Sequence, residues 1–368
     1  MTTATQALLS AGQSPWLDYI SRDLIASGEL ARMVRDREIT GVTSNPTIFE
    51  KALSSSDAYD ADIAAAAREG VTDPYEVFVR IAARDIGDAC DVLLPVYEAT
   101  GGADGFVSLE VPPGIENDID ATVAEAQRLS ALLGRPNLMV KVPGTQAGVQ
   151  ALEALIAAGI NVNQTLLFDI GVYEQSAEAY VRGLEQRREA GLPVDGPASV
   201  ASFFVSRLDT AIDPLLPEGS PLRGRAAIAN ARDAYRRFGD IFAGERWEAL
   251  AAAGARVQRP LWASTGTKNP DYSDVLYVEE LVAPQTVNTL PEATLRAVLD
   301  HATVQQTVEP GLDEARTTLD ALASAGIDLG EVTARLLTEG LAAFERDFQK
   351  LLDRIAEALS AETAGTRA

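Results

Sequence analysis

The sequence has almost no cysteine or histidine. Cys90 is its only cysteine and His301 its only histidine. This excludes disulfides within the chain, zinc sites built from cysteines and metal sites built from several imidazoles. Any metal would need carboxylate ligands, and we expect no metal site. No nucleophile accompanies His301, which disfavours Ser-His-Asp chemistry; we expect a surface residue at a helix end.

Positive charge and long apolar runs are also scarce. The chain has 54 acidic and 31 basic residues, giving a net charge of −23. Its surface should repel nucleic acid and anionic membranes, so an anionic substrate would need a local cationic pocket. Residues 1–14 lack the features of a signal peptide, and no apolar run reaches the roughly 18 residues of a membrane span. We therefore expect a cytoplasmic protein.

Lysine is rare as well, with only Lys51, Lys141, Lys268 and Lys350 in the chain. Lys141 stands inside the apolar run 137–142, which is typical of a strand. Burial disfavours the charged form of an amine and favours the neutral form, which is a nucleophile. The alternative is a buried structural ion pair. Lys141 is therefore a candidate catalytic residue.

The sequence is rich in alternating strand-like and helix-like segments. Of all residues, 46% are hydrophobic, and short apolar or β-branched runs alternate with longer segments of helical period, as in βα units with a parallel sheet. Eight such units favour an α/β fold of the (β/α)8 TIM barrel type, whose usual size of about 250 residues leaves room for additional helices. A doubly wound open sheet is the alternative. The predicted strands are Trp16–Ile20, Ile39–Thr43, Phe106–Val111, Leu138–Val142, Ile160–Thr165, Ser199–Val205, Pro260–Ala263 and Thr286–Leu290.

The segments between these strands predict helices. Cys90 falls on the apolar stripe of one of them, so it should pack in the core. Helical insertions are expected at about residues 51–105 and 209–258, with a helical tail after Ala302. Because no linker or repeat interrupts the chain, we expect residues 1–368 to form a single barrel domain.

Polar residues recur at alternate positions of the predicted strands. Side chains two apart share one face of a strand, and Asp18 is expected in the middle of the first strand. A barrel brings such groups together near the C-terminal strand ends, where barrel active sites lie. The predicted constellation is Asp18, Asn45, Glu110, Lys141, Asn163, Thr165 and Ser202.

This set of side chains suits amine catalysis. A lysine forms an imine with a ketone, a carboxylate carries protons, and amides hold substrate hydroxyls. Burial favours the neutral amine of Lys141, whereas Glu110 or Asp18 nearby would favour its ammonium form. The alternative is a structural polar core, in which buried ion pairs contribute little net stability.

Five motifs follow one another along the chain: GVTSNPTIF at 41–49, SLEV at 108–111, VKVPGT at 140–145, NVNQTLLF at 161–168 and SFFVSR at 202–207. In their order and spacing they resemble transaldolase, the Schiff-base enzyme of the pentose phosphate pathway. The resemblance covers nearly the full chain. The segment WASTGTKNP at 262–270 and residues 282–290 resemble the longer bacterial branch of that family.

The resemblance implies a barrel related to the lysine aldolases and a cofactor-free transfer of a dihydroxyacetone unit. The donor would be sedoheptulose 7-phosphate or fructose 6-phosphate, and the acceptor glyceraldehyde 3-phosphate or erythrose 4-phosphate. Lys141 would be the Schiff-base nucleophile, and Asp18 would take the proton from the C4 hydroxyl. Glu110 and Thr165 would hold the water that relays protons.

The same resemblance implies the substrate-binding residues. Asn45 and Asn163 would hold hydroxyls of the three-carbon unit with support from Ser202, and an apolar residue at the position of Phe204 would keep water away. Arg207 and Lys268 would bind the sugar phosphate by charge-assisted hydrogen bonds; Lys268 stands where the shorter branch has an arginine.

Other functions are compatible with the same scaffold. One is an aldolase that releases free dihydroxyacetone from fructose 6-phosphate, and another is a non-catalytic barrel that binds sugar phosphates. An isomerase is the third, although a single histidine and an interior lysine favour imine over enediol chemistry. The sequence leaves open whether the protein is a monomer or a homodimer.

Overall fold

Eight parallel strands form a closed barrel in the computed structural model, which describes residues 2–365. Each strand pairs with its neighbours in chain order, and β1 also pairs with β8, which closes the sheet and confirms the barrel over the open sheet. The strands are β1 (Gln13–Leu17), β2 (Gly41–Thr43), β3 (Val107–Glu110), β4 (Leu138–Pro143), β5 (Val162–Leu167), β6 (Ser199–Phe204), β7 (Arg259–Ala263) and β8 (Thr286–Leu290).

The first strand begins and ends earlier than predicted. It covers Gln13–Leu17, so the expectation that Asp18 lies in mid-strand is wrong. Polar Gln13 looked like loop, but its buried amide donates to Leu281 O at 2.7 Å and to Thr286 Oγ1 at 2.9 Å. The backbone N–H of Asp18 still donates to Leu290 O at 2.8 Å. Asp18 therefore stands just past the C-terminal end of β1, at the barrel mouth.

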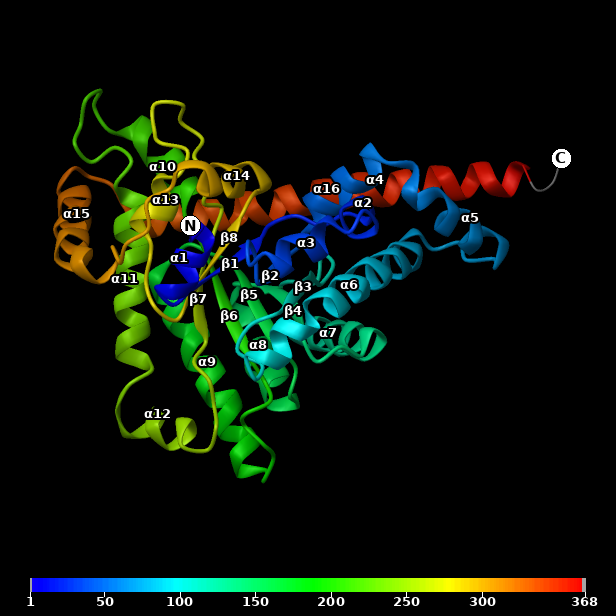
Figure 1. Ribbon diagram of the computed structural model, residues 1–368, viewed down its shortest axis with the longest axis horizontal. Coiled ribbons are helices and arrows are strands. Elements are labelled where there is room, and N and C mark those ends of the chain that lie inside the picture. Colours follow the sequence, from blue (N-terminus) through cyan, green and yellow to red (C-terminus); the bar gives the residue numbers. More distant parts are fainter. Residues whose placement is uncertain (1, 366–368) are drawn as a thin grey trace.

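Helices surround the barrel on its outside (Figure 1). None of those within residues 2–365 is both long and apolar enough to cross a membrane. They are α1 (Ala4–Ser10), α2 (Arg22–Ala26), α3 (Glu29–Arg35), α4 (Pro46–Ser55), η1 (Asp57–Tyr59), α5 (Asp60–Arg68), α6 (Pro74–Ala99), α7 (Ile119–Leu133), α8 (Gln146–Ala158), α9 (Ile170–Glu189), α10 (Ser206–Ile212), η2 (Asp213–Leu215), α11 (Ala226–Ile241), α12 (Gly244–Ala251), α13 (Leu276–Glu280), α14 (Glu292–His301), η3 (Glu309–Gly311), α15 (Leu312–Ser324) and α16 (Leu329–Gly365).

The last helix, α16, runs past the barrel along α4 and α5 (Figure 1). It also packs against α6 and α10 and reaches β5. Phe348 on α16 packs edge-on against Phe78 on α6, with ring centroids 5.3 Å apart. Thr47 on α4 donates to Asp347 on α16 at 2.5 Å. These contacts hold α16 across the mouth of the barrel, far in sequence from the strands that form it.

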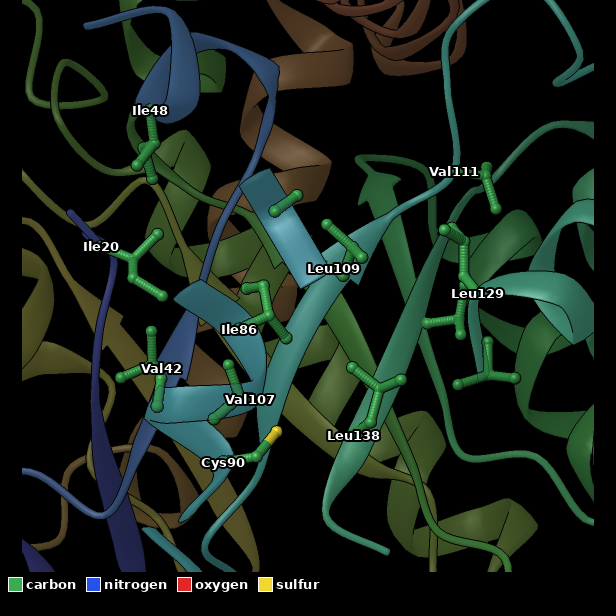
Figure 2. Close-up of a cluster of buried hydrophobic side chains, with 14 of the residues drawn as sticks. Ile20, Val42, Ile48, Ile86, Cys90, Val107, Leu109, Val111, Leu129 and Leu138 are labelled. Atoms are coloured by element: carbon green, nitrogen blue, oxygen red, sulfur yellow. The ribbon is translucent and has the colours of Figure 1, made fainter. Parts of the chain in front are cut away.

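The core between the barrel wall and α6 is apolar. Cys90 lies there among aliphatic side chains that include Val107 and Leu138 (Figure 2), and it is fully buried. Burial raises the pKa of its thiol to about 12, so the reactive thiolate is disfavoured. The predicted core role of Cys90 is confirmed. His301 is exposed at the end of α14 between Asp274 and Asp300, which confirms its predicted place on the surface.

Candidate active site

Lys141 lies inside the barrel on β4, between polar residues of the two adjacent strands. The strand register aligns Lys141 with Glu110 on β3 and with Asn163 on β5. Lys141 is 4% exposed, and its Nζ donates to Ser44 O at 2.9 Å and lies 3.2 Å from Glu110 Oε2. The ion pair with Glu110 and the hydrogen bond to the Ser44 carbonyl hold the Lys141 side chain in place. Removing one proton would therefore produce a nucleophile already aimed into the barrel.

Glu110 is the carboxylate in contact with this lysine. It is 7% exposed, and burial raises its pKa, an effect that the adjacent Lys141 ammonium partly offsets. Its Oε2 atom forms the ion pair with Lys141 Nζ and makes no hydrogen bond to any other group within residues 2–365. A carboxyl group with a raised pKa beside the reactive amine is suited to exchange protons with a bound small molecule.

Asp18 approaches from the other side of the barrel mouth. Thr43 Oγ1 is within hydrogen-bonding distance of Asp18 Oδ1 at 2.7 Å and of Thr289 Oγ1 at 2.6 Å, which fixes the carboxyl group between β1, β2 and β8. Burial raises the pKa of Asp18; the positive charge of Lys141 and then the Thr43 hydrogen bond oppose this, as do Arg207 and Lys268 more weakly. Asp18 is thus suited to both hold and release a proton.

A cavity of about 440 Å³ opens at the C-terminal ends of the strands. Its wall includes Phe344 from α16 besides residues of the barrel. Glu110 and Asn163 lie outside this lining but contact Lys141 and Ser202, which belong to it. The predicted site residues that line the cavity are Asp18, Asn45, Lys141, Thr165, Ser202, Phe204, Arg207 and Lys268.

The amides and hydroxyls divide into free and engaged groups. Asn163 donates to Ser108 Oγ at 3.1 Å and accepts from Ser202 Oγ at 2.6 Å, so it positions Ser202. Asn45 caps α4 by accepting from Ile48 N at 3.0 Å, and its Nδ2 group has no hydrogen bond to any described residue. The buried Thr165 Oγ1 also lacks a partner in that part of the chain. Asn45 and Thr165 therefore have hydrogen-bonding capacity left for a ligand.

Cationic side chains surround the mouth of the cavity. The guanidinium of Arg207 lies 5.1 Å from the ring centre of Phe204, and Lys51 and Lys268 are exposed on the same wall. Most arginines of this chain are paired with carboxylates, but these three side chains form no ion pair with a residue in the described range 2–365. This is the local cationic pocket that an anionic substrate would need in an acidic protein.

Sequence reasoning missed several residues of this site. Three of the four lysines line the same cavity, and that scarcity was a signal that could have identified Lys51. Thr43 and Ser44 lie in a predicted strand and the adjoining motif, but their contacts with Asp18 and Lys141 depend on barrel closure. Phe344 gave no signal, because only the packing of α16 brings it to the mouth.

The described part of the chain contains no cluster of side chains arranged to bind a metal ion. No group of three or more histidine, cysteine, aspartate or glutamate side chains is arranged there to hold a metal ion. The arrangement instead provides an amine beside a carboxylate, a second carboxylate across the cavity, and cations at its mouth. That combination can form an imine with a phosphorylated ketose and move protons around it.

Comparison with known proteins agrees with this chemistry. The sequence model for "Transaldolase/Fructose-6-phosphate aldolase" matches residues 15–355. A transaldolase of Thermobifida fusca is 50% identical over 99% of this chain and 100% of its own. Transaldolase 2 of a Nostoc species is 48% identical over 94% of both chains, and transaldolase 1 of Streptomyces coelicolor is 48% identical over 98% of this chain and 96% of its own. The chain therefore belongs to the transaldolase/fructose-6-phosphate aldolase family of enzymes.

Proposed function

We propose that this protein is a transaldolase of the pentose phosphate pathway. It transfers a dihydroxyacetone unit from sedoheptulose 7-phosphate or fructose 6-phosphate to glyceraldehyde 3-phosphate or erythrose 4-phosphate. The observation that carries this is Lys141, buried 3.2 Å from Glu110 beside a cavity whose mouth holds unpaired cations. The reaction uses no cofactor, because the lysine itself supplies the electron sink.

The reaction begins with imine formation. The neutral amine of Lys141 attacks the C2 carbonyl of the ketose, and water leaves after proton transfers. Glu110 and Thr165 hold the water that relays these protons; the unpartnered Oγ1 atom of Thr165 and the contact of Glu110 with Lys141 support this role. The iminium nitrogen then draws electrons from the neighbouring carbon–carbon bond.

Cleavage and transfer follow at the other side of the cavity. Asp18 takes the proton of the C4 hydroxyl, and the C3–C4 bond breaks. The aldose phosphate leaves, and the electron pair of the broken bond stays on the three-carbon unit, which becomes an enamine on Lys141. The enamine carbon attacks the aldehyde of the acceptor, and Asp18 returns its proton to the new alkoxide. Hydrolysis of the resulting imine releases the new ketose and restores Lys141.

Substrate binding has its own residues in this proposal. Asn45 holds a hydroxyl of the three-carbon unit through its free Nδ2 group, and Asn163 supports Ser202 beside it. Phe204, 8% exposed and packed on Phe168, shields the enamine from water. Arg207 and Lys268 bind the phosphate at the mouth.

A plain aldolase is the second candidate, because the matching family model includes fructose-6-phosphate aldolase in its description. The two activities differ in whether water quenches the enamine before an acceptor arrives. Incubation with fructose 6-phosphate alone distinguishes them. Release of free dihydroxyacetone at the rate of the full transfer reaction would establish the aldolase instead.

The decisive test is borohydride reduction in the presence of fructose 6-phosphate, followed by intact mass measurement and peptide mapping. We expect a stable three-carbon adduct on Lys141 in the wild-type protein and none in Lys141→Ala. The control is Lys350→Ala, whose lysine pairs with Asp347 on the surface at 3.3 Å and should leave the adduct unchanged. An active, folded sample without an adduct would refute imine catalysis.

The remaining features of the proposal concern the molecule as a whole. We propose that residues 1–368 form one barrel domain, and that the protein works in the cytoplasm on sugar phosphates rather than on nucleic acid or membranes. Whether it works as a monomer or a homodimer is a separate question for light scattering in solution.

A further inference from the structure

The segment that carries Lys268 has no helix or strand of its own. Residues 264–275 connect β7 to α13, and Lys268 is exposed in the middle of them. A lysine on an irregular segment would ordinarily sample many positions. Two sets of hydrogen bonds, one at each end, restrain this segment.

The first set lies where the segment leaves the barrel. Ser206 N donates to Ser264 O at 3.0 Å, and the hydroxyls of the two serines are also 3.0 Å apart. Thr265 Oγ1 donates to Asn288 Oδ1 on β8 at 2.9 Å. Ser206 begins α10 and immediately precedes Arg207. The segment of Lys268 is therefore tied at its start to the helix of Arg207.

The second set lies after Lys268 and uses two tyrosines. Tyr272 donates its hydroxyl to Asp213 Oδ2 at 2.6 Å, and Tyr277 donates to Asp209 Oδ2 at 2.8 Å. Both aspartates belong to α10 and the η2 turn that follows it. This end of the segment is thus tied to the same element as the first.

The residues around Tyr272 pack closely against its ring. Asp213 uses its other oxygen, Oδ1, to accept from Gly224 N at 2.9 Å. A Cβ atom on Gly224 would lie 2.8 Å from Tyr272 Cζ, and Gly224 has a φ of +70°. A side chain there would displace the tyrosine as well as strain the backbone. Gly224, Asp213 and Tyr272 therefore form one packed unit.

Both carboxylates are buried, which is costly unless their acceptors are used. Asp213 is 9% exposed and Asp209 is 1% exposed, and each accepts one backbone N–H besides its tyrosine. Asp213 in η2 thus holds the irregular segment through Tyr272, and Asp209 in α10 holds the start of α13 through Tyr277. The two cations at the cavity mouth, Arg207 and Lys268, lie on the elements that these hydrogen bonds join.

We propose that Tyr272, held by Asp213, is a positioning residue that keeps Lys268 beside Arg207, so that both bind one phosphate and the site selects phosphorylated sugars. This inference rests on the proposed function. Tyr272 makes no contact with substrate in this scheme. Its hydroxyl fixes the segment, and the effect reaches the substrate only through the ammonium of Lys268.

The test compares adduct formation from two donors. Borohydride trapping on Lys141 is measured against the concentration of fructose 6-phosphate and of fructose, in wild type, Tyr272→Phe, Lys268→Ala and the double variant. Tyr272→Phe keeps the ring on Gly224 and removes only the hydroxyl. The matched control is Tyr235→Phe on α11, which removes another tyrosine hydroxyl lying 3.4 Å from a carboxylate, that of Glu309.

Loss of one such hydrogen bond should raise the half-saturating concentration of fructose 6-phosphate by about threefold to tenfold. The value for fructose should change less than about twofold, and in the Lys268→Ala background Tyr272→Phe should add nothing, as expected of two residues acting as a unit. Tyr235→Phe should leave the half-saturating concentrations of both donors unchanged. Maximal trapping should be unchanged in Tyr272→Phe.

Two results would overturn the proposal. One is an equal effect of Tyr272→Phe on both donors, and the other is an effect that is fully additive with Lys268→Ala; each would indicate a general structural role. Failure of the proposed function is distinct from both: without imine catalysis the wild-type protein would form no adduct from either donor, and a plain aldolase would release free dihydroxyacetone from fructose 6-phosphate alone.

Discussion

The two ends of the barrel both bury polar groups, but they use them differently. At the N-terminal end, Asp104 accepts from Ser14 Oγ and, at 2.8 Å, from Trp16 Nε1. Arg259 donates to Ser14 Oγ at 2.7 Å, to Thr286 O at 2.5 Å and to Ala103 O at 3.2 Å. These hydrogen bonds join β1, β7, β8 and the loop before β3.

The C-terminal end leaves hydrogen-bonding capacity unused. In the described part of the chain, Thr165 Oγ1 lacks a hydrogen bond, Glu110 Oε2 has Lys141 as its only partner, and Arg207 and Lys268 lack ion pairs. Cavity size alone would point to the wrong end, because the N-terminal end has a cavity of about 610 Å³ against about 440 Å³ at the mouth. Unused polar atoms beside a nucleophile are what distinguish a reactive site from a structural network.

The largest effect expected at the reactive end, after the loss of Lys141 itself, comes from Asp18→Asn. The amide cannot take the C4 proton, so kcat should fall by about 10²- to 10⁴-fold. Imine formation precedes this step and does not need it. Borohydride should therefore trap a six-carbon phosphorylated adduct on Lys141 from fructose 6-phosphate, where wild type yields a three-carbon one.

The mass of that adduct separates a role in cleavage from a general loss of structure. A three-carbon adduct formed at the wild-type rate in Asp18→Asn would mean that another group takes the proton. Asp23→Asn on the nearby helix α2 is a suitable control, since it makes the same change outside the cavity lining.

A smaller and opposite effect is expected at the N-terminal end. Asp104→Ala removes the acceptor of Ser14 and Trp16, whose indole is fully buried, and should lower the free energy of unfolding by about 1–3 kcal/mol. The rate at saturating substrate should change less than about twofold, because the carboxylate lies at the end of the barrel opposite the imine. Urea denaturation and steady-state kinetics on one preparation check both. A fall in kcat without a loss of stability would contradict the division between the two ends.

The periodicity of the strand segments was enough to predict most of the fold. The alternation around Lys141 placed its side chain inside the barrel, and the register confirms Glu110 and Asn163 as its neighbours. The predicted bounds of β8 agree with the structure, because both ends of that strand carry clear signals. Two strands were displaced. β1 lies earlier than predicted, since buried Gln13 and Ser14 have the composition of a loop but the hydrogen bonds of a strand, and β5 (Val162–Leu167) lies later than the predicted Ile160–Thr165.

The depth of a side chain within the barrel was harder to predict than whether the side chain points inward. Asn163 faces inward as expected, yet its amide is occupied by Ser108 and Ser202 and lies outside the cavity lining. Alternation reports the face of a strand but not which of several inward groups is exposed to a ligand. Contacts across large sequence distances were also inaccessible, as with Phe344 of α16, because they depend on tertiary packing alone.

The smallest predicted effect tests whether the buried carboxylate of Glu110, at the C-terminal end of the barrel, lowers the stability of the fold. Burial raises the folded-state pKa of Glu110 above its unfolded value, so the ionised carboxylate is disfavoured in the fold. The stability associated with its proton is fully present below the unfolded pKa and is lost as pH rises through the folded pKa. Each unit of such a shift corresponds to about 1.4 kcal/mol.

Glu110→Gln mimics the protonated carboxyl at every pH and so removes this loss. The free energy of unfolding of Glu110→Gln, minus that of wild type, should therefore increase as pH rises from about 4, near the unfolded pKa of glutamate, to 8. The variant should lose transfer activity while it gains relative stability, which is the opposite of Asp104→Ala. A difference that stays flat or falls with pH would mean that Lys141 stabilises the Glu110 carboxylate enough to offset its burial, and the contrast between the two ends would then rest on geometry alone.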